Sequence, residues 1–230
     1  MFDANGSYPL KRGLMENFCY QSNHTHLKHG NRLSHIETKK MNLLDQLNNS
    51  IQSQMIEQPT FYIPKLVDED YGVELQDKLI PECNMSLTTL DFKIELRCDV
   101  DLAYRLMPCD FDKHLNFLNT LAHGGHTGKF LYLDCEDADW LDRAKFASET
   151  YNNLYLGNVI TAISALSQNP ESHAKRLLGR KVFLAGINTD ASKEVFTISF
   201  DDPRRCFIVR PTYLHEYDAF DYFGLLALEI

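Results

Sequence analysis

The sequence lacks the features that mark secreted, membrane-spanning or disulfide-bonded proteins. Its six cysteines are widely spread and include no Cys-x-x-Cys pair, which indicates reduced, mostly buried thiols. No apolar stretch approaches the ~20 residues that a transmembrane helix needs. The N-terminal stretch MFDANGSYPLKRG has no basic start followed by an apolar run, so it predicts no secretory signal. We therefore expect a cytoplasmic protein without a membrane partner, incorporated into a viral particle if the chain is a particle component.

Complete catalytic signatures are also missing. The chain has no Gly-x-Ser-x-Gly motif and no cysteine beside a histidine in a recognisable active-site context. The stretch HGGHTGK at 123–129 shares residues with a phosphate-binding loop, but His123 stands at the first glycine position and Phe130 follows the lysine. It also leads from a predicted helix into a predicted strand, the reverse of the order that such a loop needs. The sequence therefore favours a non-enzymatic protein and predicts no cofactor.

What the sequence does contain is an ordinary globular composition with an uneven distribution of charge. Its 230 residues, 44% of them hydrophobic, suffice for one main core. Residues 1–36 carry four Lys/Arg against two acidic residues, a balance of +2, so the net charge of −9 leaves −11 on the remaining 194 residues. An acidic body repels phosphate backbones at long range, which argues against direct binding of nucleic acid.

Residues 1–36 predict an extended polar arm, and residues 37–230 a single domain. The arm shows neither helical nor strand periodicity and is dense in Asn, Ser, His and Gly. Its metal-capable side chains do not have the spacing of a known zinc module. We expect the mildly basic arm to contact an acidic neighbour. Its four histidines are interpreted first as ordinary hydrogen-bonding surface residues, with metal binding and a pH-dependent contact as alternatives: His24, His26, His29 and His35.

Periodicity in the rest of the chain predicts an α+β fold with a mixed or mainly antiparallel sheet packed with several helices. The strict alternation of LDFKIELRC at 90–98 favours such a sheet over a doubly wound parallel one. A helix over 37–58 should end before Pro59, and Pro170 should open another. Further helices are predicted over 110–123 and in three pieces of 139–178. A loop is predicted over 67–74. Further predicted strands cover 60–65, 129–134, and a meander over 180–210.

One set of side chains suggests a metal site. A metal-dependent hydrolase or nuclease is an alternative function in which the flexible loop and the end of the following strand supply the ligands. The same region also has a structural interpretation, in which Gly124 ends a helix and the last helical residue complements the helix dipole. The candidate ligands are His123, His126, Asp134 and Glu136.

The C-terminal run suggests a protein interface. Aromatic side chains interspersed with carboxylates combine rigid anchors with a polar rim, although the same aromatics would also suit the edge of the domain's own core. The candidate interface residues are Tyr213, Tyr217, Phe220, Tyr222 and Phe223.

These observations favour a non-enzymatic structural or assembly subunit of a larger complex. A component of a viral or phage particle is the specific expectation, with the arm and the aromatic C-terminus contacting other subunits, either the same chain or different ones. A second alternative is a cytoplasmic inhibitor or immunity-type protein that uses its acidic body to bind a basic partner.

Overall fold

The computed structural model describes residues 45–66, 71–88, 95–98, 107–108, 112–136, 139–188 and 194–229. All of them fall within one compact unit, Asn42–Ile230. The arm predicted for residues 1–36, with its four candidate histidines, lies outside the described residues.

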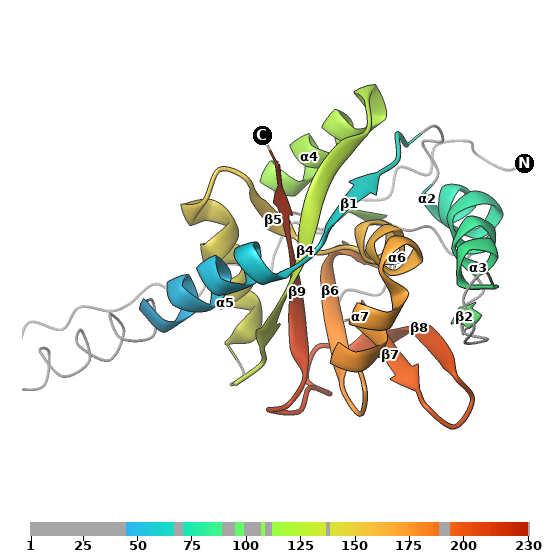
Figure 1. Cartoon of the computed structure of the whole chain (residues 1–230). Coiled ribbons are helices and arrows are strands. Elements are labelled where there is room, and N and C mark those ends of the chain that lie inside the picture. The colour runs from blue at the N-terminus through green and yellow to red at the C-terminus, as the bar shows by residue number, and fades with distance from the viewer. Residues whose placement is uncertain are drawn as a thin grey trace, which may run out of the picture. The chain divides into compact units, whose positions relative to one another are not determined.

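The described strands form one sheet of nine strands (Figure 1). Six of the pairings are antiparallel, whereas β2 pairs with β8 and β6 with β9 in parallel, which confirms the predicted α+β class with a mixed, mainly antiparallel sheet. The path through the sheet is β1 (Thr60–Ile63), β4 (His126–Asp134), β9 (Tyr222–Leu228), β6 (Lys181–Asn188), β7 (Glu194–Asp201), β8 (Cys206–Tyr213) and β2 (Glu95–Cys98), with β3 (Met107–Pro108) beside β6 and β5 (Leu154–Leu156) beside β9.

Helices cover both faces of the sheet. A helix over residues 45–57 and α5 (Trp140–Thr150) bury their apolar sides in one core. The other core receives α3 (Ile80–Thr88), α4 (Asp112–His123) and α6 (Val159–Gln168), and α6 leads into the short α7 (Pro170–Arg176). The described part of the helix predicted over 37–58 is confirmed, because Leu47 and Ile51 are buried and the helix ends before Pro59, whereas residues 37–44 lie outside the described residues.

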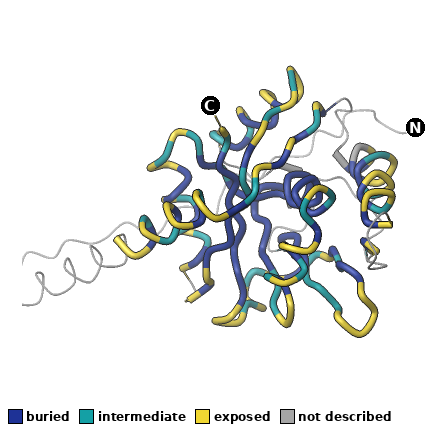
Figure 2. Tube along the Cα trace, in the orientation of Figure 1, coloured by how far each residue is buried: buried dark blue, intermediate teal, exposed yellow. Residues whose placement is uncertain are grey.

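The central strands alternate between the two cores. Phe130 and Tyr132 of β4 face the core under α6, whereas Leu131 and Leu133 face the core under α5. The same alternation runs along β9 and β6, so these three strands are buried on both sides, as the tube in Figure 2 shows. Strands with one buried and one exposed face are therefore found at the outside of the sheet, as in β1 and β2. The four described residues of the predicted 90–98 strand agree: Leu96 of β2 is buried between exposed neighbours.

The segment predicted as a loop over 67–74 is partly helical. Residues 71–73 form α2 (Tyr71–Val73), which continues into a π-helix, η1 (Glu74–Leu79), and then into α3. In the π turn the Ile80 N–H bonds the Leu75 carbonyl, five residues back. Pro81 follows immediately; it cannot donate a hydrogen bond, and its ring crowds the carbonyl four residues earlier, so the wider turn lets the helix continue past it. In the sequence, the proline argues against a helix here, although the buried residues recur every four positions: Leu75, Leu79, Cys83 and Leu87.

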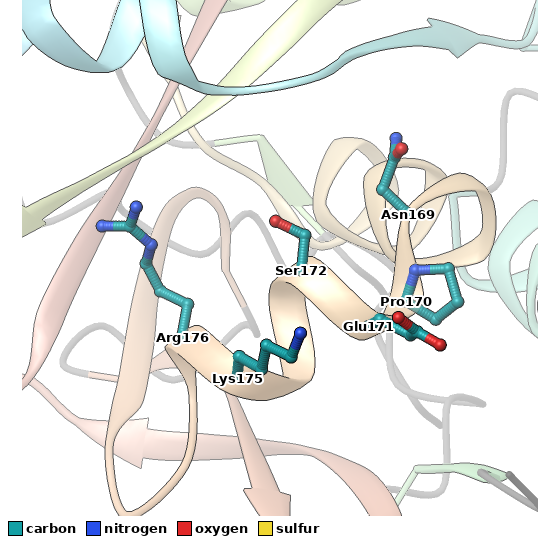
Figure 3. Close-up of a pocket in the computed structure, with 6 residues that line it drawn as sticks. All are labelled: Asn169, Pro170, Glu171, Ser172, Lys175 and Arg176. Carbon is teal, nitrogen blue, oxygen red and sulfur yellow. The ribbon is translucent and has the colours of Figure 1, made fainter.

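The starts of α6 and α7 follow from local sequence. The side chain of Asn158 accepts the Thr161 N–H at 2.9 Å and forms a capping box at the start of α6. Pro170 opens α7 as predicted, and Asn169 precedes it at the N-cap position, although its side chain makes no capping hydrogen bond (Figure 3). Gly179, with φ of +69°, allows the chain to turn back after α7.

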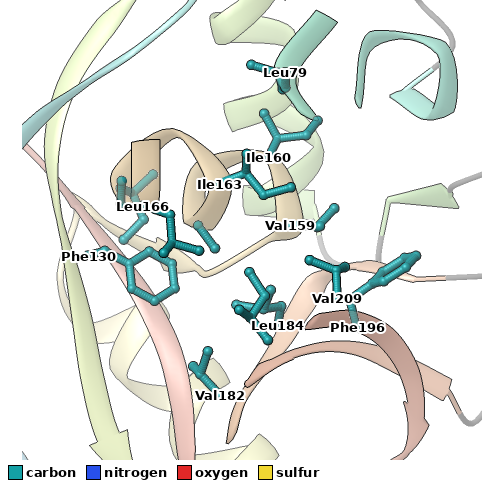
Figure 4. Close-up of a cluster of buried hydrophobic side chains, with 14 of the residues drawn as sticks. Leu79, Phe130, Val159, Ile160, Ile163, Leu166, Val182, Leu184, Phe196 and Val209 are labelled. Atoms are coloured by element: carbon teal, nitrogen blue, oxygen red, sulfur yellow. The ribbon is translucent and has the colours of Figure 1, made fainter. Parts of the chain in front are cut away.

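The larger core lies between α6 and the sheet. Figure 4 shows Val159, Ile163 and Leu166 of α6 beside Leu184 of β6 and Phe196 of β7. Residues 159–166 of α6 are all buried, so this helix is enclosed on every side rather than amphipathic. α3 packs on it from outside.

Amide side chains bond the backbone of one residue on each end strand of the path, β1 and β2. Gln168 bonds both backbone groups of Tyr62 on edge strand β1, accepting its N–H at 2.8 Å and donating to its carbonyl at 2.7 Å. On the opposite edge strand β2, Asn84 accepts the Leu96 N–H at 2.7 Å and donates to the Leu96 carbonyl at 3.2 Å. A third amide, that of Gln54, bonds the Tyr132 backbone beyond the end of β1. These side chains occupy the hydrogen-bonding groups that an added strand would use.

Candidate functional site

The structure does not bring the four candidate metal ligands together. His126 and Asp134 are the first and last residues of β4, eight steps of ~3.4 Å and thus about 27 Å apart along the strand. The Nδ1 atom of His123, at the end of α4, lies 2.7 Å from the Asn119 carbonyl oxygen. Glu136 lies 3.5 Å from Arg143. No three His, Cys, Asp or Glu side chains converge anywhere in the described part of the chain, which disfavours the metal-site interpretation.

The five aromatic residues predicted as an interface separate into buried and exposed groups. Tyr222 and Phe223 lie in β9 with exposed fractions of 8% and 0%, so they belong to the core. Tyr217 is half-buried against the α5 core. Tyr213 and Phe220 remain exposed, at 45% and 69%. The surface candidates are therefore limited to residues 213–220, before β9 begins.

A network of hydrogen bonds orders the turn over residues 214–221, which connects β8 to β9. The carboxylate of Asp221 is buried, and its two oxygens accept the backbone N–H groups of Lys181 at 3.0 Å and Asp218 at 2.8 Å. The ammonium group of Lys181 lies 3.7 Å from the same carboxylate and donates to the Glu216 carbonyl. The turn is thus fixed to the first residue of β6, a central strand.

Phe220 is the residue that this ordered turn exposes. Its N–H bonds the Asp218 carboxylate at 3.3 Å, and the Asp221 N–H bonds the Asp218 carbonyl at 2.9 Å. Its backbone is therefore held on both sides while its ring remains 69% exposed. An exposed aromatic ring on a preordered backbone suits binding, because little conformational entropy is lost when a partner covers the ring.

A buried pair beneath α7 has a structural role. Tyr132 of β4 and His173 of α7 share a hydrogen bond between the hydroxyl and the ring Nδ1. Burial lowers the pKa of His173 to about 4 and raises the pKa of Tyr132. Both groups are therefore neutral at pH 7 and bond each other away from solvent, which fixes the orientation of both rings.

A second buried histidine has no such partner. His114 of α4 is fully buried, and neither of its ring nitrogens has a hydrogen-bond partner among the described residues. Burial lowers its pKa to about 4, so it is neutral at pH 7. A Cβ placed on Gly186 would lie 2.5 Å from its ring, which shows how closely β6 covers it. Sequence patterns missed this residue, although its spacing from Phe117, Leu118 and Leu121 places it on the buried stripe of α4.

Cationic side chains cluster where β4 ends and β6 begins. The segment 175–181 holds four Lys/Arg and no acidic residue, in a chain of net charge −9. Arg180 lies 4.9 Å above the Tyr222 ring, bonds its hydroxyl, and lies 3.9 Å from Asp134. Arg176 lies 5.6 Å above the Tyr132 ring. Arg176 and Arg180 thus each lie over a tyrosine ring of the sheet.

In comparisons with known proteins, no family model, curated protein or solved structure matches this chain. Among the described helices, none combines the length and apolar character needed to cross a bilayer.

Proposed function

We propose that this chain is a non-enzymatic subunit of a larger complex that contacts another protein through the 214–221 turn. The observation that carries the proposal is the exposed ring of Phe220 on a backbone held by Asp218 and Asp221. A component of a viral or phage particle is the kind of assembly we propose.

The energetics of the turn support this function. Covering an exposed Phe side chain stabilises a complex by roughly 1.5–3 kcal/mol. Ordering a flexible residue costs about 1–2 kcal/mol, which would cancel that gain. Because hydrogen bonds to Asp221 already order the turn, most of this cost is met during folding rather than binding.

The charge of the turn indicates the chemistry of the partner. Glu216 and Asp218 are exposed and flank the half-buried Tyr217. A complementary surface would combine an apolar pocket for Phe220 with Lys or Arg side chains at its rim. This chemistry fits a neighbouring subunit of the assembly.

The amide bonds on the end strands β1 and β2 favour side-chain docking over sheet extension at these positions. Tyr62 and Leu96, one on each edge strand, have their backbone groups bonded by Gln168 and Asn84. A neighbour is therefore expected to pack against a surface such as the turn rather than to add a strand.

The acidic turn also suits the alternative function of an inhibitor or immunity-type protein. Both functions use the same surface, but an inhibitor forms a closed complex of one copy with one basic partner, whereas an assembly subunit has several neighbours. Light scattering of the isolated complex distinguishes the two by its mass.

Site-specific photo-crosslinking tests the proposed contact. A photoreactive phenylalanine analogue replaces Phe220 in cells that produce the protein, and the control carries it at Tyr62, an exposed aromatic residue on the edge strand β1. We expect one discrete crosslinked species, with the same or another subunit, from position 220 and none from position 62. Absence of an adduct at 220, or equal yields at both positions, would refute the contact.

A further inference from the structure

Two surface segments of opposite charge meet at one end of the sheet. Strands β6 and β9 are parallel neighbours that start at this end, so the residues just before them lie side by side. Those residues are the segment 175–181, which leads from α7 into β6, and the 214–221 turn (Figure 1). The Lys181 N–H bonds the Asp221 carboxylate at 3.0 Å, which joins the two segments directly.

The charges of the two segments are complementary and only partly matched within the chain. Segment 175–181 has four Lys/Arg and no acidic residue, whereas the turn has three acidic residues and no Lys/Arg. Among the described residues, one ion pair joins the two segments, that of Lys181 with Asp221 at 3.7 Å. Lys175 and Glu216 are both exposed, and neither forms an ion pair with another described residue.

Each segment also exposes an apolar side chain. Leu178 is 55% exposed in the first segment, and Phe220 is 69% exposed in the turn. Three backbone steps of ~3.8 Å separate Leu178 from Lys181, and Phe220 directly precedes Asp221. The two side chains are therefore close enough to belong to one interface patch of standard size, about 800 Å² per partner. Beside Leu178, a Cβ on Gly179 would meet no atom within 4 Å, so there is room for an incoming ring.

We propose that this end of the sheet binds a second copy of the same chain across a twofold axis. The twofold rotation places the 214–221 turn of each copy against segment 175–181 of the other, so the acidic and basic surfaces face one another twice. In each contact Phe220 packs against Leu178, and the Glu216 carboxylate approaches the Lys175 ammonium. Such a contact closes on itself and forms a dimer rather than an open filament.

This inference rests on the proposed function, because it names the partner of the 214–221 turn. The partner chemistry inferred for the turn is an apolar surface with Lys or Arg side chains at its rim. That combination is present on the chain itself, in Leu178 and the Lys/Arg side chains of segment 175–181. A second copy therefore supplies the surface that the turn requires.

Sedimentation velocity of charge-reversed variants of the full chain tests the twofold contact. Lys175→Glu and Glu216→Lys should each raise the dissociation constant of the dimer about tenfold or more, since like charges then meet in both contacts. An equal mixture of the two variants should associate like the parent, because each mixed dimer brings opposite charges together in both contacts. This recovery also shows that both variants are folded, and the mass of the recovered species distinguishes a dimer from a longer chain of copies.

Arg210→Glu is the matched control, because it makes the same change of charge at an exposed residue of β8 and should leave the dissociation constant unchanged. A parent that sediments as a monomer at every concentration would overturn the dimer, as would a mixture that associates no better than either variant alone. Photo-crosslinking from position 220 separates this inference from the proposed function. An adduct with another copy supports both, an adduct with a different protein alone supports the protein contact but overturns the dimer, and absence of an adduct contradicts both.

Discussion

The end strands of the sheet and the 214–221 turn differ in which groups they leave open to a partner. At the edges, Gln168 and Asn84 bond the backbone groups of β1 and β2 that an added strand would use. In the turn, the backbone N–H groups of Asp218 and Phe220 are also bonded, yet the Phe220 ring is left 69% exposed. We propose that association through the backbone is disfavoured at these two edge residues, and that the Phe220 side chain on its ordered turn is the surface that a partner contacts.

Acid should destabilise the folded domain most strongly, through its buried histidines. His114 and His173 have folded pKa values of about 4, below the ~6.5 of an unfolded histidine. Between these values the unfolded chain binds more protons, so stability is complete above pH ~6.5 and decreases toward pH 4. Each histidine accounts for roughly 3 kcal/mol of this loss.

Urea unfolding measured from pH 7 to pH 4 tests this expectation. His114→Gln and His173→Gln should each flatten the loss of stability in acid, whereas the exposed His215→Gln should not change it. An unchanged acid profile in both buried-site variants would show that other groups control acid unfolding.

Removing Asp221 should disorder the turn. In Asp221→Ala, the N–H groups of Lys181 and Asp218 lose their acceptor and the Lys181 ammonium loses its partner. We expect a loss of about 3 kcal/mol in the free energy of unfolding, with crosslinking from position 220 sharply reduced. Asp202→Ala, at an exposed turn, serves as the control and should stay within ~0.5 kcal/mol of the parent. Equal stability of the two variants would contradict the proposed role of Asp221.

Opening an edge should have the smallest effect on stability and a visible effect on association. Gln168→Ala removes both bonds to the Tyr62 backbone and should cost about 1 kcal/mol. The freed edge should also produce concentration-dependent association in sedimentation velocity. Gln52→Ala, on the exposed side of the 45–57 helix, is the control. If Gln168→Ala remains as monodisperse as the control, the edge does not depend on this amide.

The sequence predicted those elements whose signals are local. Leu47 and Ile51 show helical spacing, Pro170 opens α7, and the strands β6, β7 and β8 form the expected meander. The short strands β3 and β5 were not predicted, and two larger elements escaped prediction because another signal competed. Pro81 hid the helix that continues through a π turn, and the aromatic residues of YFGLLAL suggested a surface where the structure has central strand β9.

The candidate site was predictable only in part. Phe220 was among the predicted interface residues, whereas Tyr222 and Phe223 proved to be core because the continuous apolar run after them forms a strand buried on both faces. The bonds that order the turn join Asp221 to Lys181, 40 residues earlier in the chain. The contacts of Arg176 with Tyr132 likewise depend on the packing of α7 against β4, which no local pattern shows.

Amide hydrogen exchange of the isolated chain tests most directly whether the turn is ordered before it meets a partner. We predict slow exchange of the Asp218, Asp221 and Lys181 amides, whose N–H groups are bonded. In Asp221→Ala the Asp218 and Lys181 amides lose their acceptor and should exchange fast. Exchange of the parent turn at the rate of an unstructured peptide would contradict the account, because Phe220 would then lack the rigid support on which the proposed contact depends.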